Sequence, residues 1–314
     1  MADARRLIGR AKSKMPVVPL SGIPRSGSPL RRTPRSALSG IVGLVPFAAF
    51  VGLFLIWPAV SLFRLAVRPT RNSNISAMRE AVTGSYLDSF LYTIKLSFLS
   101  ALLGAICGTF LTAAVMRVER PAWVRQAVSS FAGVAANLGG IPLAFAFLAA
   151  LGTQGLVTKA LSWFGIDLIG AGFTISNFAG ITVVYLYFQI PLMFLVTLPA
   201  FEGLRPTWRE AAANLGASPT RYWRHVGLPI LAPALLGGFL LLFANAFSAY
   251  ATAYALSSGG ARLIPVQIRF FLQGNTITGK DNLGYAMAAW MIVLMIAVMG
   301  AYLLLRKRAE QWQR

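Results

Sequence analysis

The chain of 314 residues is strongly apolar and carries few charges. Its side chains are 56% hydrophobic and 12% charged, and its mean hydropathy is +0.65. Soluble domains carry about 25% charged residues, so this share leaves too few ions to cover the surface of a water-soluble enzyme of this size. The net charge of +20 would suggest nucleic acid in a soluble protein and must here be interpreted against a membrane. The one cysteine, Cys107, lies inside an apolar run, which gives disulfides and thiolate metal sites no basis.

The hydropathy pattern predicts an all-α, polytopic membrane protein. A bilayer core requires about 20 consecutive apolar residues. Six segments meet that length: 41–63, 91–116, 127–151, 176–200, 231–256 and 285–305. The third is the least regular, since Asn137, Gly139, Gly140 and Pro142 interrupt it.

Three parts follow along the chain. Residues 1–40 combine five prolines with Ser, Gly and Arg, and we expect a disordered, basic cytoplasmic tail held near anionic lipid. Residues 41–306 form the transmembrane domain, which contains a long loop at 202–229. Residues 307–314 form a second cytoplasmic tail.

Lysine and arginine are distributed unevenly between the two sides of the predicted membrane. Twenty lie on the side of the two termini and eight on the other side, and Lys95 falls near the start of the second span. The positive-inside rule therefore places both termini of this multi-pass protein in the cytoplasm. The basic net charge is mostly topological, so no nucleic-acid partner is expected.

None of the nine acidic residues falls inside a predicted span. Carriers coupled to protons or sodium usually need an ionisable group within the membrane, and intramembrane hydrolysis needs a catalytic cluster there. Both classes are therefore disfavoured. Asn245, Ser248 and Thr252 follow at steps of three and four in the fifth span and would share one helix face. This polar stripe lines a solute path, or it hydrogen-bonds to a neighbouring helix.

Three further patterns have plain structural interpretations. Gly104 and Gly108 form a GxxxG pair, which permits close helix packing. Residues 274–281 nearly match a phosphate-binding loop, but Asp281 replaces the Ser or Thr that ligates magnesium, so this chain is not expected to be an ATPase. His225 is the only histidine, which excludes zinc sites built from several histidines.

The loop at 202–229 is predicted to form two short helices. Thr207 and Glu210 form a capping box for the first helix, and Gly216 ends it with a positive φ. Ser218 and Pro219 begin the second, and Pro229 with Pro233 marks the turn back into the membrane. Such an element inserts into a groove of another protein, or it lies on the membrane surface as an amphipathic hairpin.

The residues of this loop resemble the EAA loop in the permease subunits of ATP-binding-cassette (ABC) importers. The resemblance covers about residues 85–306, and it includes the position of the loop before the penultimate span. The matching residues are Glu210, Ala211, Ala212, Gly216, Leu228 and Pro229. The resemblance implies the type I importer permease fold, with these residues coupling the permease to an ATPase.

The same resemblance implies the partners and the transport role. The expected partners are a cytoplasmic ABC ATPase dimer, which binds the ATP and magnesium, and a second, homologous permease chain. An extracytoplasmic binding protein would deliver the solute. The stretch after Asn245 most resembles permeases for spermidine and putrescine. Related permeases carry phosphonate, sulfate or iron, and a polyamine would find no carboxylate in these spans to pair with. Asn245, Ser248 and Thr252 would then line a polar path of low affinity.

Overall fold

The computed structural model describes residues 44–69, 76–118, 123–257, 262–273 and 280–311. The predicted tail at 1–40 therefore lies outside the described residues. The chain divides into two compact units after Trp57. In the first unit, the described residues form the helical segment from Leu44, which includes a π-helical turn at Gly52–Ile56 and continues across the division into α2 (Trp57–Val67).

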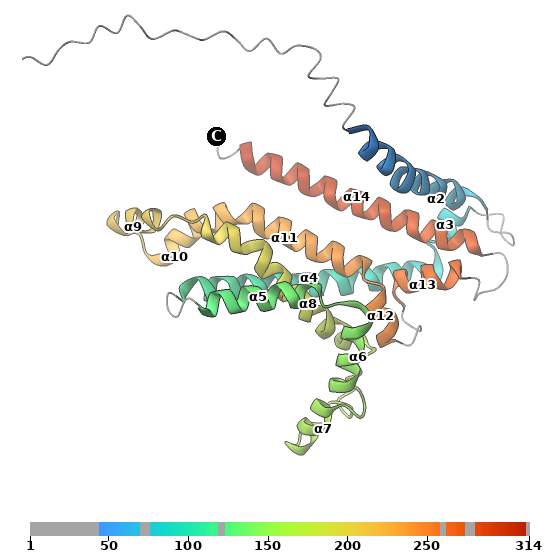
Figure 1. Ribbon diagram of the computed structural model, residues 1–314, viewed down its shortest axis with the longest axis horizontal. Helices are drawn as coiled ribbons and strands as arrows, with labels where there is room; N and C mark the ends of the chain where they lie inside the picture. Colours follow the sequence, from blue (N-terminus) through green and yellow to red (C-terminus); the bar gives the residue numbers. More distant parts are fainter. Residues whose placement is uncertain (1–43, 70–75, 119–122, 258–261, 274–279, 312–314) are drawn as a thin grey trace, which may run out of the picture. The chain divides into compact units, whose positions relative to one another are not determined.

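The regular secondary structure in the described residues of the second unit is helical, apart from one isolated bridge between Pro69 and Ser76. Figure 1 labels its helices. Their bounds are α3 (Ala77–Glu80), α4 (Gly84–Arg117), α5 (Trp123–Asn137), α6 (Gly140–Leu151), α7 (Leu156–Trp163), α8 (Phe178–Glu202), α9 (Pro206–Asn214), α10 (Pro219–Tyr222), α11 (Leu228–Ser248), α12 (Ala251–Leu256), α13 (Ile264–Leu272) and α14 (Asp281–Gln311).

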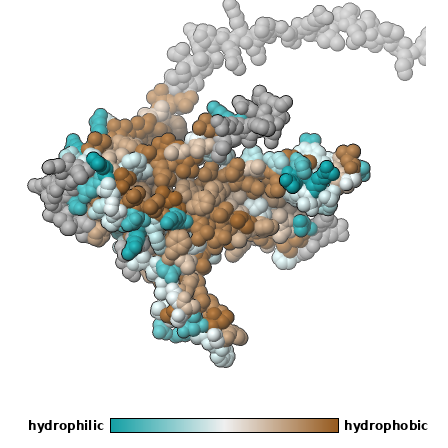
Figure 2. All heavy atoms as spheres, turned by 180° about the vertical axis from the view of Figure 1, so that it is seen from behind, coloured by the Kyte–Doolittle hydropathy of each residue, from teal (hydrophilic) through white to brown (hydrophobic). Residues whose placement is uncertain are grey.

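Six helices within the described residues are long and apolar enough to cross a membrane. They are Leu44–Val67, Gly84–Arg117, Gly140–Trp163, Phe178–Glu202, Pro219–Ser248 and Asn282–Leu304. The prediction of six spans in an all-α protein is therefore confirmed. Figure 2 shows the matching surface, on which hydrophobic residues cover the middle of the visible face and hydrophilic residues gather towards its ends.

The predicted third span, 127–151, is wrong as one continuous helix. The chain breaks between α5 and α6, where Gly139 is extended and Gly140 has a φ of +76°. The 15 residues of α5 measure about 22 Å, less than the roughly 30 Å of a bilayer core. Figure 1 shows α5 along α8, whereas α6 and α7 leave that bundle. The sequence marked this segment as irregular, but its mean hydropathy stayed high enough for one span, so the break itself was not predicted.

The centre of the second unit is the contact between α4 and α8. The buried face of α4 consists largely of small or hydroxyl side chains, at steps of three and four residues: Ser89, Thr93, Ser97, Ser100, Gly104, Gly108 and Thr112. Such residues let membrane helices approach closely. A Cβ on Gly104 would lie 2.8 Å from the Cβ of Gln189, and one on Gly108 would lie 2.5 Å from the Cβ of Met193. The packing role predicted for the GxxxG pair is thus confirmed.

Polar contacts hold this seam in register. The hydroxyls of Thr112 and Thr197 are 2.8 Å apart, and the amide nitrogen of Gln189 donates to the hydroxyl of Ser100 at 3.3 Å. Apolar packing continues on the other side of α4, where Phe243 and Phe247 of α11 are buried and stack 5.7 Å apart. Helices α4, α8 and α11 therefore form the framework on which the remaining elements are positioned.

Candidate coupling segment and transport path

Helix α9 carries three of the six predicted coupling residues, and few other residues pack against it. None of its residues is buried, and α10 is its main neighbour in the fold. Figure 1 shows α9 and α10 beyond the ends of α8 and α11. Glu210 and Ala211 are exposed and Ala212 is half-buried. The geometry therefore presents this helix to solvent or to a partner and leaves it off the bundle.

The predicted capping box at the start of this helix is wrong. Helix α9 begins at Pro206, with Arg205 in the N-cap position and without a side-chain cap hydrogen bond. Thr207 already lies within the helix, because proline favours the first helical position and moves the start two residues earlier than the box requires. Glu210 is therefore free of a capping role.

The predicted end of α9 is confirmed. Gly216 has a φ of +75°, a conformation that glycine adopts without a steric penalty. The amide of Gly216 donates to the carbonyl of Ala213, and the amide of Ala217 donates to the carbonyl of Ala212, both at 2.9 Å. This pair of bonds is a Schellman motif, which fixes a sharp turn between α9 and α10.

The second helix of the loop begins as predicted but does not end as predicted. The hydroxyl of Ser218 accepts from the amide of Arg221 at 3.3 Å, with Pro219 at the first helical position. The helix then continues through a π-helical turn, Trp223–Gly227, into α11, so that Pro219–Ser248 is one helix. The prediction that Pro229 and Pro233 mark a turn is wrong. Pro229 lies in the first turn of α11, where the π-helical turn accommodates its missing N–H.

Sequence reasoning missed one prominent residue of this segment. Leu215, between α9 and Gly216, is 87% exposed. Leu228, a predicted coupling residue, is 51% exposed, and Pro229 is exposed as well. An apolar side chain this exposed, at the tip of a projecting turn, is available for contact with another protein. The sequence contained one signal for this exposure: Leu215 stands directly before Gly216, the glycine that ends the helix.

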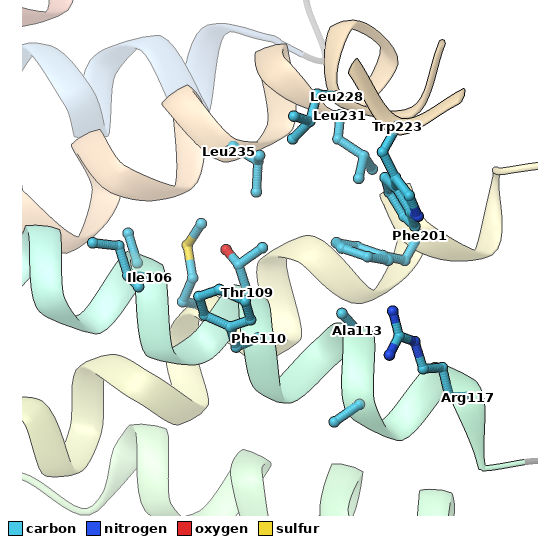
Figure 3. A pocket seen from close by; sticks show the side chains of 13 residues that line it. Ile106, Thr109, Phe110, Ala113, Arg117, Phe201, Trp223, Leu228, Leu231 and Leu235 are labelled. Atoms are coloured by element: carbon cyan, nitrogen blue, oxygen red, sulfur yellow. The ribbon is translucent and has the colours of Figure 1, made fainter. Parts of the chain in front are cut away.

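A pocket of about 640 Å³ lies beside the loop, between α4, α8 and α11. Figure 3 shows Phe201 and Trp223 at one end of it and the guanidinium of Arg117 nearby. Its other lining residues are apolar except for Thr109, and it includes Met193 and Leu235. With one hydroxyl and one charged group, this pocket offers few groups to recognise a polar solute.

The three predicted path residues do not share one helix face. Helix α11 ends at Ser248 and α12 begins at Ala251, so the predicted fifth span, 231–256, is interrupted. Asn245 is half-buried, and Ser248 is exposed with its hydroxyl bonded to the carbonyl of Ala244 at 2.8 Å. Thr252 is 4% exposed and belongs to the interior.

Thr252 joins the two helix breaks to each other. Its hydroxyl accepts from the amide of Gly140 at 2.9 Å and lies 3.3 Å from the carbonyl oxygen of that residue. Gly140 begins α6, directly after the first break, and Thr252 lies in α12, directly after the second. Irregular backbone at membrane depth is tolerated where it is buried in protein or lines a cavity. The contact with Thr252 gives the amide and the carbonyl of Gly140 a hydrogen-bond partner at the first break.

An arginine that sequence reasoning did not single out lies against the second break. The guanidinium carbon of Arg269, in α13, is 5.3 Å from the ring centre of Tyr250 and 4.6 Å from that of Tyr254. Its Nη1 donates to the hydroxyl of Tyr250, and its Nε donates to the side chain of Gln273 at 2.8 Å. We call Arg269, Tyr250 and Tyr254 the Arg269 cluster.

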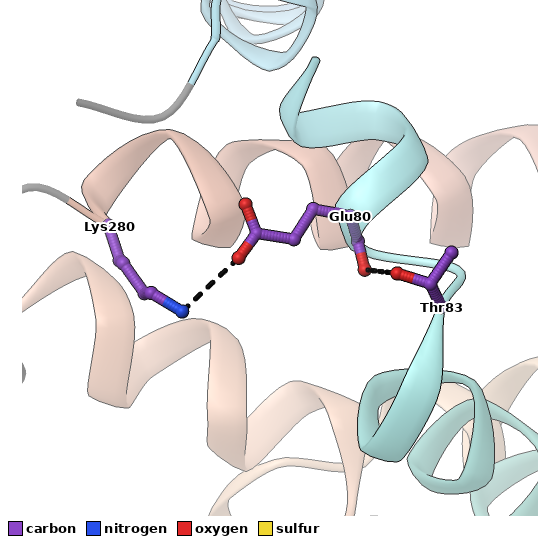
Figure 4. Close-up of polar contacts among 3 residues, drawn as sticks. All are labelled: Glu80, Thr83 and Lys280. Atoms are coloured by element: carbon purple, nitrogen blue, oxygen red, sulfur yellow. Dashed lines mark hydrogen bonds and ion pairs between the residues drawn. The ribbon is translucent and has the colours of Figure 1, made fainter. Parts of the chain in front are cut away.

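The lysine of the phosphate-loop look-alike has a structural partner. Lys280 donates to Glu80 of α3 at 3.2 Å, as Figure 4 shows, and this hydrogen bond raises the pKa of Lys280. Residues 274–279 lie outside the described residues. Within the described ranges, no group of three or more His, Cys, Asp or Glu residues could hold a metal ion.

Comparison with known families decides the identity of the chain. The profile of the family described as binding-protein-dependent transport system inner membrane component matches residues 101–311. The chain belongs to this family. It is a permease subunit of an ABC importer and is not itself catalytic, since ATP is bound by the ATPase component. The predicted importer class is therefore correct, and the chain is a multi-pass inner membrane protein.

Two curated relatives cover most of this permease. The probable sulfate transport system permease protein cysT of Prototheca wickerhamii is 27% identical over 256 residues, which are 80% of this chain and 94% of that protein. The sn-glycerol-3-phosphate transport system permease protein UgpA of Shigella flexneri is 25% identical and covers 79% of this chain and 86% of its own length.

Solved structures show the same fold. A bacterial ABC transporter involved in the import of the acidic polysaccharide alginate matches with a TM-score of 0.64 and 18% identity, over 90% of this chain and 98% of its own. The MetNI methionine ABC transporter in inward-facing conformations matches with a TM-score of 0.53 and 16% identity, over 71% and 95% of the two chains. The importer permease fold is thus established for this chain.

Proposed function

We propose that this permease forms half of the path of an ATP-driven importer for a small oxyanion such as sulfate or sn-glycerol-3-phosphate. The observation that carries the proposal is the relationship to the sulfate permease of Prototheca wickerhamii, which extends over 80% of this chain and 94% of the relative. The relative for sn-glycerol-3-phosphate adds a second solute with the same chemistry, a tetrahedral anion.

The charges of the described bundle support an anion better than the polyamine first expected. A polycation needs carboxylates along its route, yet the acidic residues in the candidate spans of the described chain lie near the ends of their helices. Asp88 is exposed near the start of α4, and Glu202 is the last residue of α8. Sulfate is the alternative solute, among those weighed from the sequence, that the named relatives support. Phosphonate and iron gain no support from them.

The proposed partners follow from the importer class. We expect a cytoplasmic ATPase dimer, a second permease that is a different but homologous chain, and a binding protein on the outer side. Helix α9 would enter a groove of the ATPase, with Glu210, Ala211, Ala212 and Gly216 at the contact and Leu228 and Pro229 behind it. The exposure of α9 and of Leu215 supports this assignment. The end of the bundle that carries α9 would then be cytoplasmic, with both termini on that side.

Asn245 and Ser248 remain our candidates for the path, because both retain exposure beside the break after α11. Thr252 would act through the contact with Gly140, as a residue that positions α6 against α12.

The test is uptake by the complete importer reconstituted in proteoliposomes with its binding protein. We expect radiolabelled sulfate or sn-glycerol-3-phosphate to accumulate when ATP is enclosed, and to continue to do so when an uncoupler collapses the proton gradient. Spermidine serves as the control solute. Accumulation of spermidine without either anion would overturn the oxyanion assignment, and uptake that follows the proton gradient would overturn the ATP-driven mechanism.

A further inference from the structure

Arg269 is held at a precise place in the bundle without a carboxylate to neutralise it. In the part of the chain that the structure describes, the ion pairs are Arg125 with Glu202 and Lys280 with Glu80. The partners of Arg269 are a tyrosine hydroxyl, a glutamine side chain and two aromatic rings, all of them uncharged. The side chain is half-buried, so its positive charge is partly removed from water.

Such an arrangement holds the side chain of Arg269 in place without an opposite charge that would neutralise the guanidinium. Cation–π contacts and hydrogen bonds to neutral groups orient a guanidinium, whereas a carboxylate would cancel its field. The guanidinium presents five N–H donors in a fork that matches tetrahedral oxyanions. The two contacts described use Nε and Nη1, which leaves Nη2 and its two N–H groups for another acceptor.

The position of the Arg269 cluster is equally specific. Tyr250 lies in the two-residue break between α11 and α12, at the end of the span Pro219–Ser248, and Tyr254 lies one turn later. Discontinuous helices in transporters gather solute sites at their breaks. Arg269 thus places a positive charge at the same break where Ser248 is exposed.

We propose that the Arg269 cluster is an oxyanion-binding site on the transport path. This inference rests on the proposed oxyanion function and names Arg269 as the residue that contacts the solute. The guanidinium would bind a sulfate or phosphate group, and the two tyrosine rings would keep the side chain in place. A sulfate group comes from the solute, whereas a phosphate group comes from the solute or from a lipid headgroup at the end of the span.

The first experiment measures uptake of sulfate and sn-glycerol-3-phosphate by the complete importer with Arg269→Gln and Arg269→Lys. Loss of a charged hydrogen bond corresponds to about a tenfold effect or more, so we expect Arg269→Gln to reduce the maximal rate at least tenfold. Arg269→Lys should restore part of it. The control is Arg79→Gln, which removes the same charge from an exposed position on α3 and should change the rate less than twofold.

The second experiment measures anion binding without transport and separates the two sources. The assembled complex in a maltoside detergent would carry Leu272→Cys in a Cys107→Ser background, which places the new thiol at an exposed position of α13 three residues from Arg269 and keeps the Gln273 contact. We expect sulfate to slow thiol labelling at least threefold relative to chloride of equal ionic strength, and Arg269→Gln to abolish this protection.

The outcomes are distinct. A wild-type importer that takes up neither anion overturns the oxyanion function and this inference with it. Wild-type uptake that Arg269→Gln leaves within twofold overturns the inference alone. Protection of the thiol by added phosphatidylglycerol, but not by sulfate, would make the cluster a lipid-headgroup site. If Arg269→Gln fails to assemble, Arg269→Lys with reduced uptake and retained ATPase activity supports the proposal, and unchanged uptake in that variant contradicts it.

Discussion

Single residues set the distances between helices in this permease. Gly108 lies where a Cβ would meet the Cβ of Met193 at 2.5 Å and the carbonyl oxygen of Ile190 at 2.7 Å. Real Cβ atoms do not approach other atoms so closely, so any larger residue must separate α4 from α8. The GxxxG pair was readable from the sequence. The hydroxyl residues that bond across the seam, Ser100 and Thr112, were not, because serine and threonine also face solvent or lipid without altering the hydropathy of a span.

We expect Gly108→Val to destabilise the folded permease by about 1–3 kcal/mol, the usual cost of overpacking a tight contact. The measurement is thermal unfolding of the purified complex in detergent. Gly133→Ala in α5 is the control, since a Cβ there meets nothing within 4 Å, and it should leave the unfolding temperature unchanged or raise it. An equal decrease in both variants would contradict the close-packing argument.

Lys280 and Glu80 link the residue before α14 to α3, outside the candidate spans. The hydrogen bond to Glu80 raises the pKa of Lys280 above its ordinary 10.5. The stabilisation is therefore complete below pH 10.5 and is lost as the pH rises through the raised pKa.

We expect Lys280→Met to lower the free energy of unfolding at neutral pH by up to about 1 kcal/mol, as for other partly exposed ion pairs. The difference from the wild type should disappear in unfolding curves recorded above the raised pKa of Lys280. Lys159→Met, at an exposed position on α7, is the matched control. A difference that persists at high pH would assign the effect to packing of the lysine chain.

At the scale of elements, hydropathy predicts where helices cross a membrane but not where they break. The spans built on α4, α8 and α14 agree with the prediction to within several residues, because their apolar runs are continuous and end in charged or polar segments. The breaks before Gly140 and after Ser248 interrupt runs that stay apolar on both sides. They depend on contacts between distant segments, such as the bond from Gly140 to Thr252, which no local pattern contains.

The coupling segment was more predictable because its turns follow local rules. Gly216 ends α9 with a positive φ and Ser218 caps α10, as glycine and serine commonly do. The predicted capping box did not form, because Pro206 begins α9 before Thr207. The Arg269 cluster was missed, since Arg269 and Tyr250 are 19 residues apart, one in α13 and the other in the break before α12.

The turn at Gly216 should be essential for coupling. Gly216→Pro removes the amide that donates to Ala213 and demands a φ near −65°, where the turn needs +75°. We expect it, and Glu210→Arg on the exposed helix, to abolish ATP-dependent uptake while membrane insertion stays normal. The control is Gly203→Ala at the other end of the loop, where φ is −71° and a Cβ meets nothing closer than 3.4 Å. Full uptake in both coupling variants would reject the assignment of α9.

For the whole molecule, composition is enough to predict a multi-pass membrane protein and its orientation in the membrane. Composition does not predict the solute. The charge asymmetry of twenty to eight sets a direction in the membrane through many small contributions. The solute depends on a few groups at the breaks and on a binding protein outside this chain. That is why the likeness to polyamine permeases pointed to a different solute than the relatives that cover most of the chain.

The orientation is testable directly. Fluorescent protein fused after Arg314 should fluoresce, and alkaline phosphatase at the same site should be inactive, since both report a cytoplasmic end. Alkaline phosphatase fused after Gln273, in the predicted outer loop between α13 and α14, should be active. The opposite pattern would reverse the assignment of sides and remove α9 from the reach of any cytoplasmic ATPase.

The uninterrupted helix from Pro219 to Ser248 has a mechanical consequence. Its 30 residues give a rod about 45 Å long, with the elbow at Gly216 at one tip and Tyr250 just past the other. The π-helical turn at Trp223–Gly227 and the internal Pro233 are places where such a helix bends. Beyond them, a tilt of the helix becomes a lateral shift at the far tip. Because Thr252 ties that tip to Gly140, the start of α6 would shift in the same stroke.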